Sequence, residues 1–481
     1  MKKKLIGDMP PEEFRKYGHE LIDWIADYLI NIEQYPVLPT VEPGEVKEKF
    51  PQNPPENGED IKKILSDIDG KIIPGVTHWN HPKFMAYFNS TSSGPGILAE
   101  LLTAALNQNG MNWKSSPIAA ELEEVTLDWL RQMLDLPEKF WGIIYDTASI
   151  SSLHAIASAK TQVEQERKDK SLLNKLCLYF SEQAHSSIEK DALFLGIKKE
   201  NIRKIKIDNA FRMMPGELRN QINKDLENNL IPFCVVATIG TTSTTSIDPV
   251  PEIAKICKEK NIWLHIDAAH AGVAAIVPEM RFILNGVENA DSIVVNPHKW
   301  LFMPIDISVY FTAKPEILKR TFSLIPEYLK TEHDKLAINY MDYGIQLGRR
   351  FRSLKLWFVI RYFGVKGLKN ILREHIKVGR QFADLINKHP QFEVLAPVPF
   401  STVCFRAIPN LEIGVTKLNE LNEHLMNEMN KTGKVFLSHT KLNNKFVIRL
   451  VVSGIRTKEE HMLEVWDLLQ KTLSELIENE Y

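Results

Sequence analysis

Cysteine is scarce in this sequence, which has 481 residues, four cysteines and no CxxC pair. The four cysteines lie in or beside apolar runs; they are Cys177, Cys234, Cys257 and Cys404. Isolated thiols in apolar surroundings are typical of buried side chains in a reducing compartment. The pattern excludes a disulfide-stabilised fold and a cysteine-based metal site, and we expect no bound metal.

Long apolar runs and an excess of charge are also absent. No apolar run reaches the about 20 residues that a membrane-spanning helix needs. Asp8, Pro10 and Glu12 interrupt the segment after the basic residues 2–4, so this segment does not resemble a signal peptide. A formal net charge of -2 gives no general attraction to nucleic acid. We therefore expect a cytoplasmic protein without membrane or nucleic-acid partners.

The central part of the sequence, residues 93–365, alternates strand-like and helix-like patterns. An example is the apolar run 233–238, the helical pattern 251–260 and the apolar run 262–267. This alternation predicts a large α/β domain built on a mostly parallel sheet. Its size is compatible with the overall hydrophobic content of 44%.

Two smaller parts flank this domain. Residues 366–481 combine long helical patterns with strand-like runs such as 402–406, which predicts a small α+β domain. Residues 1–92 open with a predicted helix that carries an apolar stripe. The stripe comprises Phe14, Tyr17, Leu21, Trp24, Ile25, Tyr28 and Ile32. It needs a covering surface, either this chain's own core or a second copy of the chain.

A lysine and an aspartate follow two of the central apolar runs. Lys299 comes shortly after the run 292–295 and next to His298, while Asp267 ends the run 262–266. A lysine amine whose pKa is lowered by burial or a neighbouring cation forms Schiff bases with carbonyl compounds. A buried carboxylate keeps a pyridine nitrogen protonated, so the two residues together indicate pyridoxal phosphate. If each residue is considered alone, two other interpretations remain open: Lys299 as a solvated loop residue, and Asp267 as an aspartate that bonds to the backbone.

Three further apolar runs, 143–145, 176–180 and 233–237, also end in polar side chains. Parallel sheets bind ligands beyond the carboxyl ends of their strands, so we expect these groups to share one site. After the first run, hydroxyls and free amides at a helix N-terminus favour a phosphate, although an ordinary helix cap fits equally well. The candidate residues after these runs, which offer side-chain or backbone polar groups, are Thr147, Ala148, Ser149, His185 and Thr242.

Five motifs together closely resemble the aromatic L-amino acid decarboxylases, the group II pyridoxal-phosphate decarboxylases of fold type I. They are SEQAHSS (181–187), VATIGTT (236–242), HIDAA (265–269), NPHKW (296–300) and LGRRFRSLKLW (347–357). The likeness extends from about Pro10 to the C-terminus. It implies a large seven-stranded sheet domain, pyridoxal 5'-phosphate as cofactor, and a homodimer with its active site at the subunit interface. It also implies decarboxylation of an aromatic amino acid to its arylalkylamine.

The resemblance assigns a role to each motif residue. It implies that Lys299 binds the cofactor aldehyde and that Asp267 pairs with the pyridine nitrogen. His185 is expected to stack on the cofactor ring, with Ala269 on the opposite face and Thr242 near the substrate carboxylate or the cofactor. The expected phosphate site comprises Thr147, Ala148, Ser149 and His298.

Tyr328 matches the proton-donating tyrosine of the family, which the resemblance places in a loop over about 321–343 and in the partner subunit's site. Relatives that oxidise their substrates to aldehydes commonly carry phenylalanine at this point, so Tyr328 favours amine formation. An aldehyde-forming oxidative enzyme remains an alternative. From a different class, a catalytically silent protein that binds the cofactor also remains open.

The segment 79–88 resembles the side-chain pocket of the family, where Trp79, Tyr87 and Phe88 are candidates to hold an aromatic ring. Ordinary core packing is an equal alternative for them. Asn109 and Met111 are further pocket candidates, in a polar stretch where the chain departs from the family pattern, and it departs again at residue 270. There His270 stands where a tyrosine commonly follows the DAA motif. Finally, we expect the basic residues at 349–355 to form the polar face of an amphipathic helix.

Overall fold

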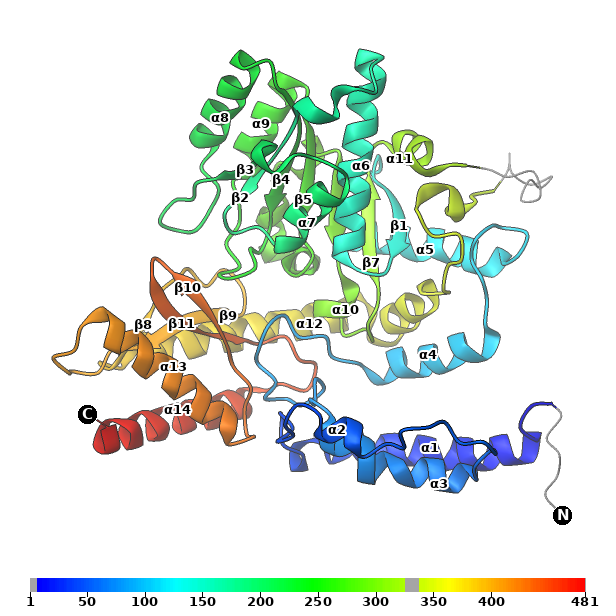
Figure 1. Ribbon diagram of the computed structural model, residues 1–481, viewed down its shortest axis with the longest axis vertical. Coiled ribbons are helices and arrows are strands. Elements are labelled where there is room, and N and C mark those ends of the chain that lie inside the picture. The colour runs from blue at the N-terminus through cyan, green and yellow to red at the C-terminus, as the bar shows by residue number, and fades with distance from the viewer. Residues whose placement is uncertain (1–6, 325–336, 481) are drawn as a thin grey trace.

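A seven-stranded sheet forms the centre of the molecule (Figure 1). The computed structural model describes residues 7–324 and 337–480. The strands run in the order β1-β7-β6-β5-β4-β2-β3. They are β1 Trp141–Tyr145, β2 Leu176–Ser181, β3 Ile202–Ile205, β4 Ile231–Thr238, β5 Trp263–Asp267, β6 Ser292–Val295 and β7 Ser308–Thr312. β2 to β6 are parallel to one another and β7 is antiparallel to both neighbours, so the predicted mostly parallel sheet is confirmed.

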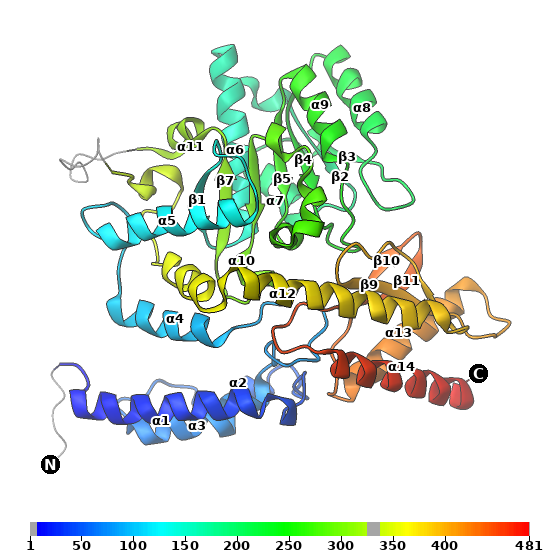
Figure 2. The same cartoon turned by 180° about the vertical axis from the view of Figure 1, so that it is seen from behind.

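Helices cover both faces of this sheet, which explains why its central strands are buried and largely apolar. Every residue of β4 and β5 is buried, as expected for parallel strands packed on both sides. Figures 1 and 2 show α6 and α7 over one face and α8 and α9 over the other. The helices of this domain are α4 Gly94–Leu106, α5 Pro117–Met133, α6 Ala148–Arg167, α7 Ser186–Phe194, α8 Pro215–Glu227, α9 Val250–Lys260, α10 Pro297–Trp300 and α11 Pro315–Phe322.

The C-terminal part forms a separate four-stranded antiparallel sheet in the order β10-β11-β9-β8. Its strands are β8 Phe392–Val394, β9 Thr402–Ala407, β10 Ser438–Leu442 and β11 Lys445–Val451, and its helices are α13 Val415–Lys431 and α14 Glu459–Glu480. The long helix α12, Ser353–Lys388, connects it to the large domain and has a non-helical backbone at Gly364. The predicted domain boundary at 365 lies beside this break.

The N-terminal helices α1 Pro11–Ile30, α2 Glu45–Glu48 and α3 Ile61–Asp67 lie apart from the large sheet in both views (Figures 1 and 2). No residue of α1 is buried, and Phe14 is 65% exposed. The described part of this chain covers the apolar stripe only in part: Ile32 is buried and the Tyr28 hydroxyl lies 2.8 Å from His78 Nδ1, whereas Phe14 remains exposed. None of the described helices combines the length and apolar character required to cross a membrane.

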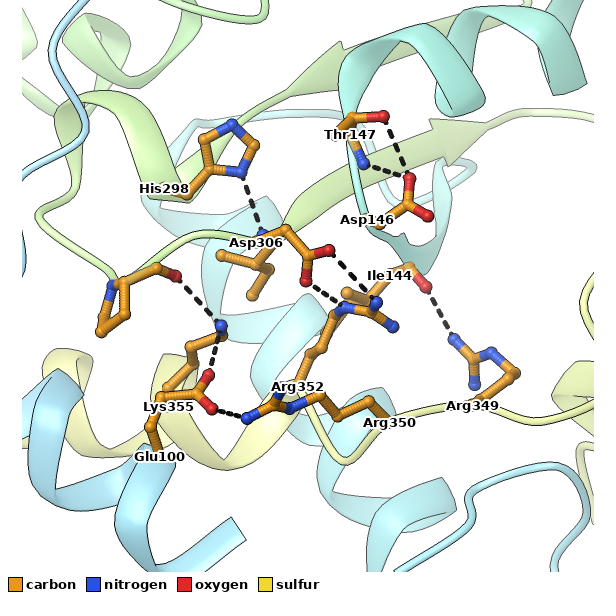
Figure 3. Close-up of polar contacts among 12 residues, drawn as sticks. Glu100, Ile144, Asp146, Thr147, His298, Asp306, Arg349, Arg350, Arg352 and Lys355 are labelled. Atoms are coloured by element: carbon orange, nitrogen blue, oxygen red, sulfur yellow. Dashed lines mark hydrogen bonds and ion pairs between the residues drawn. The ribbon is translucent and has the colours of Figure 1, made fainter. Parts of the chain in front are cut away.

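The expectation that residues 349–355 form a solvated helix face is wrong. α12 begins only at Ser353, and Arg349 and Lys355 are both buried. Arg349 Nη2 lies 2.7 Å from Glu123 Oε1 and donates to the Ile144 carbonyl at 2.8 Å (Figure 3). Lys355 pairs with Glu100. Carboxylates on α4 and α5 thus bring both cations inside the protein, and the local sequence pattern gives no sign of these distant partners.

Candidate active site

The carboxyl ends of β5 and β6 place Asp267 and Lys299 in one region of the large domain. Asp267 is the last residue of β5, and its Oδ1 accepts a hydrogen bond from the Ala269 amide at 3.1 Å. Lys299 lies in α10, which follows β6 directly. Desolvation lowers the pKa of Lys299, and the Asp267 carboxylate opposes this shift. The two groups are therefore close enough to interact, as the strand-end argument predicts.

The Lys299 amine has no ion-pair or hydrogen-bond partner among the described residues. Its Nζ lies 5.3 Å from the centroid of the Phe88 ring. Desolvation without a directly paired carboxylate makes this amine more easily deprotonated than an exposed one. This environment suits a nucleophilic amine that forms a carbonyl adduct.

His185 caps the N-terminus of α7 and remains accessible to solvent. Its Nδ1 accepts a hydrogen bond from the Ser187 amide at 3.2 Å and lies 2.9 Å from Ser187 Oγ. In the neutral ring this leaves the proton on Nε2. Desolvation lowers its pKa, while Asp267 acts in the opposite direction. His185 and Asp267 thus belong to one electrostatic cluster, and the stacking roles of His185 and Ala269 stay predictions.

The turn before α6 supplies the candidate phosphate site. Asp146 Oδ1 accepts from both the amide and the hydroxyl of Thr147, at 2.6 and 3.0 Å (Figure 3). α6 begins at Ala148 without a side-chain cap. Because Thr147 is already engaged, the backbone amides of Ala148 and Ser149 are the better candidates to bind an anion.

His298 is held by protein contacts. Its Nδ1 accepts from the Ile307 amide at 2.9 Å (Figure 3), and its Nε2 lies 3.4 Å from Asn296 Nδ2. Burial lowers the pKa of His298 to about 3. The neutral ring is fixed beside Lys299, and its contact with a phosphate stays a prediction.

Arg449, on β11 of the small domain, is a site candidate that the sequence reasoning missed. Its guanidinium is buried, and its Cζ lies 5.2 Å from the Phe88 centroid. Nε donates to the Ser243 carbonyl at 2.7 Å and Nη1 to Ser438 Oγ at 3.3 Å, whereas Nη2 has no partner among the described residues. The sequence signal was a charged residue within the apolar strand KFVIRLV. Thr242, which precedes Ser243, lies beside this region.

The predicted substrate pocket divides into two groups. Trp79 stacks on Phe84 with centroids 4.3 Å apart and lies 6.2 Å from Tyr87. Tyr87 adopts the left-handed conformation with φ 53°, and the adjacent Phe88 lies beside Lys299. These aromatic residues form one continuous segment next to the candidate lysine.

Asn109 and Met111 lie beside the segment 341–350 instead. Asn109 Oδ1 accepts from the Arg349 amide at 2.9 Å, and the Met111 carbonyl accepts from the Met341 amide at 2.9 Å. The structure gives them no contact with Lys299 or Phe88. Tyr328 lies outside the described residues.

Comparison with known proteins identifies the family. The family model described as the pyridoxal-dependent decarboxylase conserved domain matches residues 43–408. The chain belongs to the pyridoxal-dependent decarboxylase family. A phenylacetaldehyde synthase from a Rosa hybrid cultivar is 42% identical over 97% of this chain and 95% of that protein. Tyrosine decarboxylase 4 from Petroselinum crispum is 40% identical over 100% of this chain and 98% of that protein.

The fold agrees with this assignment. The crystal structure of Oryza sativa TDC with PLP and tryptamine superimposes with a TM-score of 0.96 at 34% identity. The match covers 98% of this chain and 99% of that chain. Pyridoxal phosphate is therefore the cofactor. The site fits it chemically, because it combines an amine without a partner, a buried carboxylate and a helix N-terminus without a side-chain cap.

Proposed function

We propose that this protein decarboxylates aromatic L-amino acids to arylalkylamines and carbon dioxide. The observation that supports this most strongly is the Lys299 amine, which lies over Phe88 without an ion-pair partner and within the field of Asp267. Bound pyridoxal phosphate supplies the electron sink that decarboxylation needs. Lys299 holds the cofactor aldehyde, and Asp267 keeps the ring nitrogen protonated.

Arg449 orients the substrate carboxylate in this proposal. Its unpartnered Nη2 and its position near Phe88 leave a buried positive group facing the region of Lys299. A substrate carboxylate bound to Arg449 has a fixed orientation relative to Lys299. This contact therefore orients the bond between the α carbon and the carboxylate, which breaks in the reaction. Such a contact completes a guanidinium that is otherwise left with an unsatisfied nitrogen.

Two groups are candidates to deliver the proton to the α carbon after carbon dioxide leaves. One is the Tyr328 hydroxyl, contributed by the partner subunit. The other is His185, whose Nε2 carries the proton while Nδ1 is held by Ser187. General acid catalysis requires a positioned proton donor, and the contacts with Ser187 position the His185 ring.

The aromatic class of substrate is supported by Phe88, which lies beside the lysine, whereas Trp79 and Tyr87 lie farther along the same segment. Edge and face contacts with such rings favour an aromatic side chain. The tyrosine decarboxylase named above, at 40% identity over the whole chain, supports the same substrate class.

We also propose a cytoplasmic homodimer with a shared active site. Exposed apolar side chains gather on α1 and α4, and a second copy of the chain would cover them. They include Phe14, Ile30, Leu98, Leu101 and Leu106, which are 65%, 77%, 53%, 52% and 46% exposed. The four cysteines are free and buried, as is typical of a reducing compartment.

Aldehyde formation is the second candidate function, because the Rosa relative is a phenylacetaldehyde synthase. Tyr328 favours the amine, so Tyr328→Phe should divert turnover toward aldehyde, ammonia and hydrogen peroxide. A wild-type protein that already releases peroxide stoichiometrically would instead establish the second function.

Mass-spectrometric product analysis tests the proposal directly. The candidate substrates are tryptophan, 5-hydroxytryptophan, phenylalanine, tyrosine and 3,4-dihydroxyphenylalanine, with histidine and glutamate as controls. We expect amine from at least one aromatic acid and none from glutamate. Absence of turnover with every substrate, despite bound cofactor, would favour a catalytically silent protein.

A further inference from the structure

Three rings form a continuous stack that begins at the candidate active site, and a fourth ring adjoins the far end of this stack. Phe88 and His270 have centroids 3.9 Å apart with planes at 12°, and His270 and Trp300 have centroids 5.1 Å apart with planes at 7°. His375 lies edge to edge with Trp300 in nearly the same plane, with centroids 6.4 Å apart and planes at 1°, because Trp300 Nε1 donates in its ring plane to His375 Nδ1 at 2.9 Å. The stack therefore fixes the plane of His270 through its two ring faces.

His270 uses neither of its ring nitrogens in this arrangement. Its side chain is 2% exposed, and neither Nδ1 nor Nε2 has a hydrogen-bond partner among the described residues. Burial holds its pKa well below the usual value, and the nearby charges of Lys299 and Arg449 act in the same direction. The neutral ring carries one N–H donor and one acceptor. A buried N–H donor without a hydrogen-bond partner costs free energy, and a ligand that accepts a hydrogen bond from it removes this cost.

The groups around Phe88 indicate what kind of ligand this is. His270 stacks on the Phe88 ring, and both the Lys299 amine and the Arg449 guanidinium lie near its centroid, at 5.3 and 5.2 Å. Because Lys299 is the group that holds the cofactor, the Arg449 cation and the neutral His270 donor remain beside this ring, and together they are complementary to a carboxylate. Tyr87 is directed elsewhere, because its ring packs against Phe436 at 5.6 Å.

We propose that His270 donates a hydrogen bond to the α-carboxylate of the amino acid, beside Arg449, and so distinguishes acids from amines. This inference rests on the proposed function. It makes His270 a substrate-binding residue whose orientation is set by Phe88 and Trp300.

His270→Phe tests the contact, because it retains a flat ring in the stack and removes both nitrogens. Dissociation constants of the holoenzyme are measured from the change in cofactor absorbance with two probes, 3-(4-hydroxyphenyl)propionate and tyramine. The first has the carboxylate without the amine, and the second has the amine without the carboxylate. We expect about tenfold weaker binding of the acid and less than twofold change for tyramine. His270→Tyr, which returns a hydroxyl donor, should recover part of the loss.

His375→Phe is the matched control, because it removes ring nitrogens beside the far end of the same stack. This substitution should not weaken binding of the acid more than it weakens binding of tyramine. Equal weakening of both probes by His270→Phe would overturn the inference and assign His270 a packing role, as would unchanged binding of the acid. If the wild-type protein binds both probes but forms no amine, the proposed function fails. The carboxylate contact is then tested by the dissociation constants of the two probes alone.

Discussion

Two lysines in this molecule have their pKa values lowered by burial, and their surroundings differ in one respect. Lys355 is fully buried, pairs with Glu100, and donates to the Pro304 carbonyl at 3.0 Å (Figure 3). Lys299 has no such partner among the described residues and lies over Phe88. A carboxylate ligand makes a buried lysine part of the structure, whereas its absence leaves a reactive amine.

Removing the amine of Lys299 should have the largest effect. Lys299→Ala removes the only group proposed to hold the cofactor aldehyde, so amine formation from any aromatic amino acid should fall below detection. Product mass spectrometry measures this, and Lys355→Met is the control that should still form the cofactor adduct. Wild-type amine output from Lys299→Ala would contradict the assignment.

Removing the amine of Lys355 should affect stability instead. Among the described residues, Lys355→Met leaves Glu100 with only the exposed Arg350 as an ion-pair partner, so the free energy of unfolding should fall by about 2–3 kcal/mol. Urea denaturation monitored by fluorescence measures the change. Lys299→Met is the comparison. It should lower the free energy of unfolding by less, because it removes no ion pair and leaves no carboxylate without its partner. A larger loss of unfolding free energy for Lys299→Met than for Lys355→Met would contradict this prediction.

The Lys299 amine should also differ from exposed lysines in its response to pH. Because burial lowers the pKa of Lys299, its neutral, reactive fraction is larger at neutral pH than that of an exposed lysine. Adduct formation by the apoenzyme with pyridoxal phosphate should therefore rise with pH and level off earlier than the reaction of exposed lysines. Stopped-flow absorbance measures the rate. A profile identical to that of a lysine peptide would show that the environment does not activate the amine.

Arg350 provides the smallest test. It shares Glu100 with Lys355, but its side chain is 51% exposed. Solvent screening weakens such a pair, so Arg350→Ala should lower the unfolding free energy by less than about 1 kcal/mol. A loss equal to that of Lys355→Met would show that burial does not separate the two cations.

The sequence predicted the parts of the site that follow directly from strand ends. Asp267 and Lys299 come immediately after apolar runs, and the order of a parallel sheet places such ends on one edge. Local sequence was sufficient here because each residue is positioned by the strand before it. The mostly parallel sheet followed from the same alternation of strands and helices.

Contacts between distant segments were not predictable in this way. Arg449 reaches Phe88 from a strand of the small domain, and its neighbours in sequence are ordinary core residues. Arg349 and Lys355 were expected on the polar face of one helix because of their local pattern, which gives no sign of their partners Glu123 and Glu100 on separate helices. The ring stack through His270 likewise joins segments that have no common motif. Such pairings depend on tertiary packing, which one local pattern does not encode.

The most direct measurement is reductive trapping of the cofactor. The purified protein is incubated with pyridoxal phosphate, reduced with borohydride, digested and examined by mass spectrometry. We predict a phosphopyridoxyl group on the peptide that contains Lys299 and none on the peptide that contains Lys355. An unmodified Lys299 peptide, with the label on another lysine or on none, would contradict the account.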